Sequence, residues 1–301
     1  MVIKNEIQNL QKNFSDIFKY FEDVIIVDTG STDGCIEYLK DNFSLKVIKS
    51  EIVESTAFSK SPCRNIALEQ VKTDWILSLD ADEQITVDSL KSMYALEPNP
   101  SISGYFAYWD NYIQGQGSFF DYKLFLYRKG TKVRGLVHEN AQIDLRIKGQ
   151  QAVWTDCYSV MHFPDASKHR YKTHFYKERL KKAIQINPDW LRYYWFLGYM
   201  LFQQDDFVHS TKWLKKCYEG KSSYFPVEQL NSIMCSIQIY SILRDHQNYS
   251  KLLKRYIIRY HEVSNDFEVR INTHLVEFAA SAKNSLETKE YINNFLPRFA
   301  R

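Results

Sequence analysis

The chain has 301 residues, enough for one large domain or two ordinary ones, with 45% hydrophobic and 25% charged residues. Its net charge of +3 is too small to indicate a nucleic-acid-binding protein by itself. No apolar run approaches the roughly 18 to 20 residues of a membrane span, and no signal-peptide pattern opens the chain. We therefore expect a soluble, cytoplasmic protein, at most peripheral at the inner face of the membrane. The five cysteines are scattered and odd in number, which favours reduced thiols.

The first eighty residues alternate helical and strand patterns. Apolar positions three and four apart predict an amphipathic helix over residues 5–20. Strands are expected at 24–28, 45–48 and 75–79, with a short helix at 35–40 and a longer one beginning at Ser61-Pro62 and ending near residue 71. Strands that alternate with helices predict a parallel sheet with right-handed crossovers.

Three carboxylates, Asp80, Asp82 and Glu83, follow the predicted strand 75–79. In a parallel sheet they would lie at the carboxyl end of the strand, where open α/β sheets bind ligands, and Asp28 would end a neighbouring strand. A D-x-D pair there can hold a divalent cation and leave positions for phosphate oxygens. The hypothesis is a metal-bound diphosphate, and the alternative is a polar turn that only ends a strand.

Four short motifs carry a family resemblance. They are Lys4-Asn5-Glu6, Val27-Asp28-Thr29-Gly30-Ser31-Thr32-Asp33-Gly34, Arg64-Asn65-Ile66-Ala67-Leu68 and Asp74-Trp75-Ile76-Leu77-Ser78-Leu79-Asp80-Ala81-Asp82-Glu83. In this order and spacing they resemble family 2 glycosyltransferases of the GT-A fold. The resemblance implies an inverting transfer of a sugar from a nucleotide-diphosphate donor, with UDP-glucose as the first expectation. One departure is the short apolar segment Met1-Val2-Ile3, because family members usually have several more apolar residues here, which form the first strand beside the nucleotide-base pocket.

The next segment continues the resemblance. A helix to about residue 96 is followed by aromatic strands at 105–112 and 123–127, joined by a glycine-containing connection at 114–118 that is a candidate acceptor loop. The motif 134–139 and a strand over 153–161 that ends at His162 are similar to bacterial members that carry helical repeats. In those relatives a histidine after the last strand completes the metal site, which implies Asp82 and His162 as ligands of Mn²⁺ or Mg²⁺.

The resemblance also implies roles for other side chains. Asp80 would contact the ribose or the water shell of the metal. Asp28 would accept a hydrogen bond from the nucleotide base, and Arg64 would lie near the nucleotide base or the diphosphate. No Glu-Asp pair follows the D-x-D, so Glu139 is the candidate catalytic base, with Asp110 and Asp121 as alternatives.

From about residue 167 the pattern is helical, so we expect a GT-A catalytic domain over 1–165 and an α-helical domain over 166–301. Helices are expected at about 227–243, 249–260, 266–282 and 286–295. Leu197-Gly198, Ser210, Leu214 and Cys217 match a tetratricopeptide-type helical pair, which predicts a small solenoid. It would bind the acceptor, form a homodimer or only cover the sheet. A basic cluster follows His162, and Arg170 or Lys172 could bind the donor.

The acceptor is open at this stage. Similar enzymes include sublancin-type peptide S-glycosyltransferases and lipopolysaccharide core glucosyltransferases, so a peptide or a cell-surface glycan is expected, with nucleic acid as a further alternative. Two other functions are open: a catalytically inactive repeat-containing binding protein and a nucleotidyltransferase. The latter lacks the glycine-rich nucleotide loop that it would need near the amino terminus.

Overall fold

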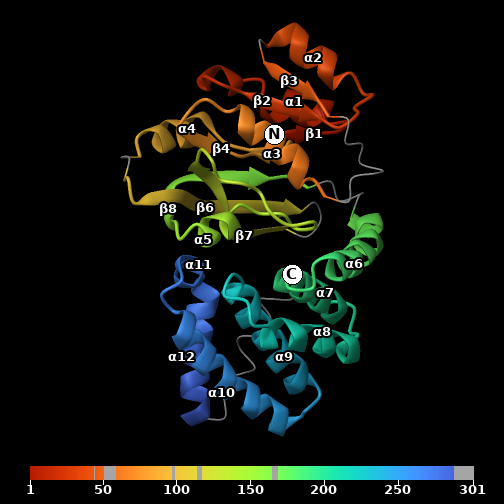
Figure 1. Ribbon diagram of the computed structural model, residues 1–301, viewed down its shortest axis with the longest axis vertical. Helices are drawn as coiled ribbons and strands as arrows, with labels where there is room; N and C mark the ends of the chain where they lie inside the picture. Colours follow the sequence, from red (N-terminus) through yellow and green to blue (C-terminus); the bar gives the residue numbers. More distant parts are fainter. Residues whose placement is uncertain (44, 51–58, 97–98, 114–116, 165–168, 288–301) are drawn as a thin grey trace. The chain divides into compact units, whose positions relative to one another are not determined.

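The computed structural model describes residues 1–43, 45–50, 59–96, 99–113, 117–164 and 169–287. It consists of two compact units, Met1–Lys172 and Thr173–Arg301. The first is a mixed α/β unit and the second is helical, which confirms the predicted fold class (Figure 1). Within the described ranges no helix is both long and apolar enough to cross a membrane.

A three-stranded parallel sheet opens the first unit. Its order is β1 (Val2–Ile3), β2 (Ile25–Asp28), β3 (Lys46–Lys49), and Ile3 lies opposite Asp28 in the register. The helices of this region are α1 (Ile7–Asn13), α2 (Cys35–Asn42) and α3 (Ser61–Gln70), and a 3₁₀ turn, η1, covers Phe18–Tyr20. The single helix expected over residues 5–20 is therefore interrupted. Its apolar spacing persists because both pieces bury side chains in the same core.

A five-stranded sheet follows, in the order β4-β7-β6-β8-β5. Its strands are β4 (Trp75–Leu77), β5 (Glu83–Gln84), β6 (Ile102–Ile113), β7 (Gly117–Arg128) and β8 (Gln151–His162). Only β6 and β8 run parallel; the other pairs are antiparallel. The prediction that strand 75–79 belongs to the parallel sheet was wrong, because β4 pairs antiparallel with β7 through Ile76 and Tyr127.

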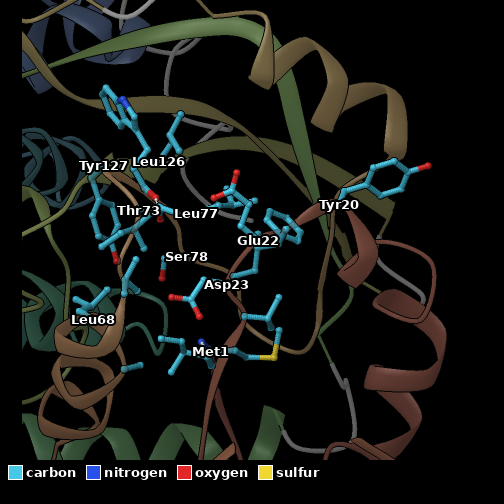
Figure 2. Close-up of a pocket in the computed structure, with 18 of the residues that line it drawn as sticks. Met1, Tyr20, Glu22, Asp23, Leu68, Thr73, Leu77, Ser78, Leu126 and Tyr127 are labelled. Atoms are coloured by element: carbon cyan, nitrogen blue, oxygen red, sulfur yellow. Dashed lines mark hydrogen bonds between the residues drawn. The ribbon is translucent and has the colours of Figure 1, made fainter. Parts of the chain in front are cut away.

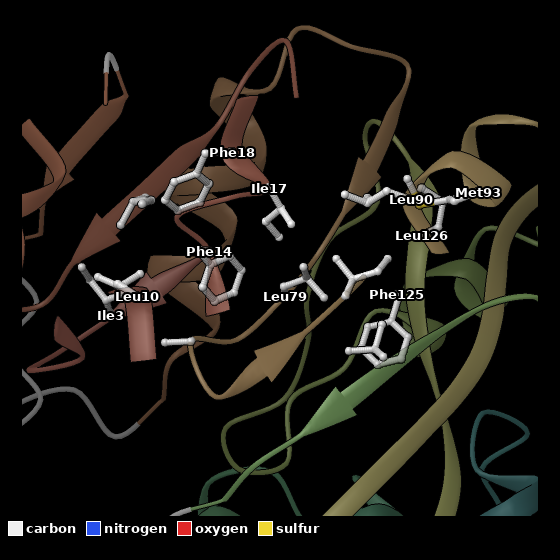
Figure 3. Close-up of a cluster of buried hydrophobic side chains, with 14 of the residues drawn as sticks. Ile3, Leu10, Phe14, Ile17, Phe18, Leu79, Leu90, Met93, Phe125 and Leu126 are labelled. Atoms are coloured by element: carbon white, nitrogen blue, oxygen red, sulfur yellow. The ribbon is translucent and has the colours of Figure 1, made fainter. Parts of the chain in front are cut away.

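Two further helices, α4 (Val87–Tyr94) and α5 (Gln142–Ile147), complete the α/β unit, and both contact β8. One core cluster links the two sheets, and in it Leu79 lies between Phe14 and Ile17 on one side and Phe125 on the other (Figure 3). Because Leu79 directly precedes Asp80, burial of this leucine fixes where the acidic residues begin.

The helical unit contains α6 (His169–Ile186), α7 (Leu191–Phe202), α8 (Phe207–Glu219), α9 (Pro226–Ile242), α10 (His246–Val263), α11 (Phe267–Ile271) and α12 (Thr273–Glu287). The helix expected over 266–282 is divided at Asn272, whose backbone is extended. The helix expected at 286–295 lies almost wholly outside the described residues. Helices α7 and α8 approach closely where the Ser210 hydroxyl donates to the Gly198 carbonyl at 2.8 Å.

Candidate functional site

The acidic turn after β4 is held in place from both sides. The Asn13 side-chain amide donates to the Ala81 carbonyl at 2.9 Å, and the backbone N–H of Phe163 donates to the Asp82 carbonyl at 2.8 Å. Glu83 begins β5, which pairs with β8 so that Glu83 lies opposite His162. Residues far apart in the sequence thus fix the backbone that carries the three carboxylates.

Asp80 is bound by two cations. Arg64 Nη2 lies 2.7 Å from one carboxylate oxygen of Asp80, and Lys123 Nζ lies 3.3 Å from the other. Burial opposes ionisation of Asp80, but the charges of Arg64 and Lys123 outweigh it and hold the pKa of that carboxyl well below its usual range. Asp80 also raises the pKa of Arg64. Asp80 therefore stays ionised and orients the Arg64 guanidinium.

Glu83 and Lys123 form the buried part of this charge cluster. Glu83 is 1% exposed and its Oε1 lies 2.5 Å from Lys123 Nζ. Burial raises the pKa of Glu83 above its usual value although Lys123 opposes the change. Burial would lower the pKa of Lys123, but Glu83 and Asp80 raise it instead. The other Glu83 oxygen accepts the Asp80 backbone N–H at 2.8 Å, so Glu83 also shapes the acidic turn.

Asp82 points to a different partner from Asp80. Its Oδ2 lies 3.4 Å from Nε2 of His162, the last residue of β8. His162 Nδ1 lies 2.7 Å from Oδ1 of Asn111 on β6, and the His162 ring stacks on Trp109 with centroids 4.6 Å apart. The structure therefore brings Asp82 and His162 together, while Asp80 faces Arg64 and Lys123.

The Asp82–His162 pair has the donor chemistry of a divalent-cation site. A carboxylate oxygen and an imidazole nitrogen are ligands that Mn²⁺ accepts. In the described part of the chain, His, Cys, Asp and Glu do not form any group of three or more that could hold a metal. Two protein ligands suit a cation whose remaining positions are filled by water and phosphate oxygens. These residues fit such a metal.

The Asp28 side chain is hydrogen-bonded to the backbone of the turn that follows it. Asp28 is 3% exposed, and its carboxylate accepts the backbone N–H groups of Gly30 at 3.1 Å and Ser31 at 3.2 Å. Gly30 has a φ of 103°, a conformation that glycine adopts without strain. Asn5 reinforces the same turn, because its Oδ1 accepts the Thr32 N–H at 2.7 Å. Two of the motifs that carry the family resemblance thus interlock through hydrogen bonds.

Glu139 lies at the amino-terminal end of α3. Its Oε1 accepts the backbone N–H of Lys60 at 2.8 Å and the Ser59 hydroxyl at 3.3 Å. Its charge also contributes to the raised pKa of Arg64, after the larger effect of Asp80. Glu139 and Asp80 are therefore both electrostatic neighbours of Arg64.

The loop that carries Glu139 is anchored by a residue that the sequence did not single out. Asp144 is fully buried and accepts hydrogen bonds from the Lys132 N–H and the Arg134 side chain, and Lys148 Nζ lies 2.6 Å from its Oδ2. Burial opposes ionisation, but these contacts lower the pKa of Asp144. Arg134 and Asn140 then close the loop through a backbone bridge.

The remaining predicted residues are the two alternative bases on β6 and β7, the basic residues of α6 and the candidate acceptor loop. Strand alternation puts Asp110 on the opposite face of β6 from Asn111, and burial raises the pKa of Asp110. Asp121 lies opposite Trp109 in the register, and its Oδ1 accepts the N–H of Tyr122. The side chains of Arg170 and Lys172, and residues 114–116 of the candidate acceptor loop, lie outside the described part of the structure.

A cavity of about 400 Å³ lies beside this cluster (Figure 2). It is lined by the segment before β2, by α3, by β4 and by the end of β7; Leu68 and Tyr127 lie on one side and Tyr20 on the other. Its walls include Asp23 and Thr73, which precede β2 and β4. Ligands of open α/β sheets bind at the opposite, carboxyl ends of the strands. The acidic cluster is therefore the better candidate site, and Arg64, which lines the cavity, connects the two.

Two site residues were missed at the sequence level. Lys123 directly precedes four buried residues of β7, Leu124 to Tyr127, so a charge at the start of this apolar run could have indicated a carboxylate partner. Asn111 gave no such signal, because its role depends on β6 and β8 lying side by side.

A family profile agrees with these observations. The Glycosyl transferase family 2 profile matches residues 1–153, about half of the chain. The chain therefore belongs to glycosyl transferase family 2. A curated relative, an uncharacterized glycosyltransferase of Rickettsia bellii, is 24% identical over 110 residues, which are 36% of this chain and 35% of the relative. The matched segment thus spans about a third of that relative.

Solved structures give weaker similarities. Staphylococcus aureus TarS 1–349 with UDP-GlcNAc is 14% identical and has a TM-score of 0.45, covering 96% of this chain and 91% of TarS 1–349. GalNAc-T7 with UDP, GalNAc and Mn²⁺ is 17% identical with a TM-score of 0.38, covering 54% and 43%. TM-scores below 0.5 carry no argument about individual residues, so the site rests on its own geometry.

Proposed function

We propose that this protein is an inverting, metal-dependent glycosyltransferase that transfers a sugar from a UDP-sugar to a peptide or cell-surface glycan. The observation that carries the proposal is the position of Asp82 Oδ2, 3.4 Å from His162 Nε2, beside an Asp80 that is bound by Arg64 and Lys123. Family 2 membership supports the same reaction class. UDP-glucose remains the first donor to test.

Asp82 and His162 would hold Mn²⁺ or Mg²⁺. When bound, the cation neutralises negative charge that develops on the departing diphosphate. Arg64 would add a second positive charge near the diphosphate or the nucleotide base. Asp80 would hold the Arg64 guanidinium in place or contact the ribose. Asp28 would accept a hydrogen bond from the nucleotide base while it shapes the turn before α2.

Glu139 is the proposed base. In the transfer step the acceptor oxygen or sulfur attacks the anomeric carbon and its proton passes to Glu139, while the bond from that carbon to the diphosphate oxygen breaks and UDP leaves. Attack opposite the leaving group inverts the anomeric configuration. The assignment of Glu139 as the catalytic base is supported by its position beside Ser59 and Lys60, within electrostatic reach of Arg64.

The helical unit would recognise the acceptor or form a homodimer. A tetratricopeptide-type arrangement is supported by the close approach of α7 and α8, where a Cβ added at Gly198 would lie 2.7 Å from Leu214. We propose domain limits of 1–165 and 166–301, and a donor-binding role for Arg170 or Lys172.

The test is release of UDP from a panel of UDP-sugars with Mn²⁺, Mg²⁺ or a chelator. Wild-type protein should release UDP from one donor only with metal, and Asp82→Ala should abolish the release. Asp88→Ala is the matched control, because Asp88 is an almost fully exposed acidic residue on α4. Metal-independent release would refute the metal assignment, and absence of both release and UDP binding would favour an inactive binding protein.

A further inference from the structure

Asn111 is a buried amide between the Asp82–His162 pair and the interior of the second sheet. It is 2% exposed and lies on β6, directly beside His162 in the parallel β6–β8 register. Its Nδ2 donates to the carbonyl of Trp109 at 2.9 Å. That bond fixes the orientation of the amide, because only the nitrogen can donate to a carbonyl. The amide oxygen, Oδ1, therefore faces His162.

This orientation determines which nitrogen of His162 carries the proton. Asn111 Oδ1 lies 2.7 Å from His162 Nδ1 and can only accept, so Nδ1 must donate. A neutral imidazole has one N–H, which leaves the lone pair on Nε2. That lone pair faces Asp82 Oδ2 at 3.4 Å.

Stacking on Trp109 restricts rotation of the His162 ring. The two rings stack at 4.6 Å with an angle of 22° between their planes. Lys123 also lies over this indole, with its Nζ 5.3 Å from the ring centroid. A His162 ring flipped by 180° would bring Cδ2 against Asn111 Oδ1 and lose the 2.7 Å bond.

We infer that Asn111 is a positioning residue that holds His162 in the Nδ1–H tautomer with Nε2 free to bind the cation it shares with Asp82. The inference rests on the proposed function for the identity of that cation. Hydrogen bonds to the second nitrogen of a ligating histidine fix its tautomer and orientation, and their loss typically costs about 10- to 100-fold in metal affinity.

The first test reads the tautomer without metal. Imidazole ¹⁵N spectra of the full chain at pH 8, with the His162 signals assigned among the eight histidines by their loss in His162→Gln, should show a proton on Nδ1 and none on Nε2. Asn111→Asp keeps an acceptor at this position and should preserve this pattern, whereas Asn111→Leu should shift the proton toward Nε2. A wild-type spectrum with the proton on Nε2 overturns the inference, even if Asn111→Leu does not fold.

The second test measures Mn²⁺ affinity by calorimetry in the presence of UDP. Asn111→Leu should bind Mn²⁺ about 10- to 100-fold more weakly than wild type. Asn111→Asp should lose no affinity, and UDP affinity in chelator should be the same in all variants. Asn42→Leu is the control, because Asn42 is exposed and its side-chain amide donates to the Tyr38 carbonyl of its own helix. Wild-type affinity in Asn111→Leu refutes the inference.

The two tests separate this inference from the proposed function. If wild-type protein has the expected tautomer but binds no Mn²⁺ with UDP, the metal assignment fails while the positioning by Asn111 stands. If Mn²⁺ binds at Asp82 and His162 but the tautomer of His162 is unchanged in Asn111→Leu, the metal assignment stands and the positioning role of Asn111 fails.

Discussion

Replacing Lys123 with methionine tests the charge cluster most severely. Methionine keeps much of the side-chain length but removes the cation that pairs with Glu83 and Asp80. Glu83 is 1% exposed and Lys123 is 31% exposed, so the pair is largely buried. Removing one partner of a buried pair costs about 3–5 kcal/mol, a large part of the roughly 5–15 kcal/mol that stabilises a typical domain.

The loss should depend on pH in a defined direction. Burial already raises the folded-state pKa of Glu83, and loss of Lys123 raises it further. A carboxyl with a raised folded pKa is least costly when it is protonated in both states, and its cost grows as pH rises from the unfolded-state pKa toward the folded-state pKa. Asp80 keeps Arg64 and a lowered pKa, so its charge is constant between pH 5 and 8. Lys123→Met should therefore be more destabilising at pH 8 than at pH 5.

The assay is urea-dependent hydrogen exchange read by mass spectrometry, because it separates the two units. Peptides of β6 and β7 should lose protection in Lys123→Met, while peptides of α9 provide an internal reference. Lys91→Met, at an exposed pair with Asp88, should change stability by about 0.5 kcal/mol or less.

A second substitution sharpens the test. Adding Glu83→Leu to Lys123→Met removes the unpaired buried carboxylate and should restore part of the lost stability. A loss below about 1 kcal/mol in the single variant, or an equal loss at pH 5 and 8, would refute the assignment of Lys123 as the partner of a buried charge.

Other substitutions test separate parts of the account. Asp144→Ala should destabilise the α/β unit by about 1–3 kcal/mol, since it removes the buried acceptor of the Lys132 N–H and of the Arg134 side chain; an unchanged urea midpoint would contradict this. Gly198→Ala should destabilise the helical unit by about 1–3 kcal/mol through contact with Leu214, and Leu214→Ala in the same chain should show non-additivity; additive effects would exclude the contact as the cause. Glu139→Gln keeps an oxygen for the Lys60 N–H but no basic group, so transfer should fall about 100-fold with UDP affinity unchanged, and normal transfer would eliminate Glu139 as the base.

Local patterns predicted much of the fold. The apolar run before Asp28 and the Ser61-Pro62 helix start placed β2 and α3 within a residue or two, because burial and the fixed φ of a proline in the first helical turn act over neighbouring positions. Pairing was less predictable. Strand β4 has only three residues, and its antiparallel partner β7 lies about fifty residues later, so nothing near Trp75 indicated the correct sheet.

The candidate site divides in the same way. Asp82 and His162 were named through a family resemblance, and the structure brings them together by pairing β5 with β8. Lys123 and Asn111 could not be placed beside them without the arrangement of β6, β7 and β8. Asp28 was found from its motif, but the motif did not reveal that its carboxylate oxygens are hydrogen-bonded to the backbone of its own turn.

The most direct test of the proposed site is UDP binding by calorimetry, with Mn²⁺ and with chelator, in wild type, Asp82→Ala and His162→Ala. If Asp82 and His162 hold a cation that contacts the diphosphate, Mn²⁺ will increase the UDP affinity of the wild type and will not increase that of either variant. An equal UDP affinity with and without Mn²⁺ in the wild type, or a Mn²⁺ effect that survives in both variants, would contradict the metal site at Asp82 and His162.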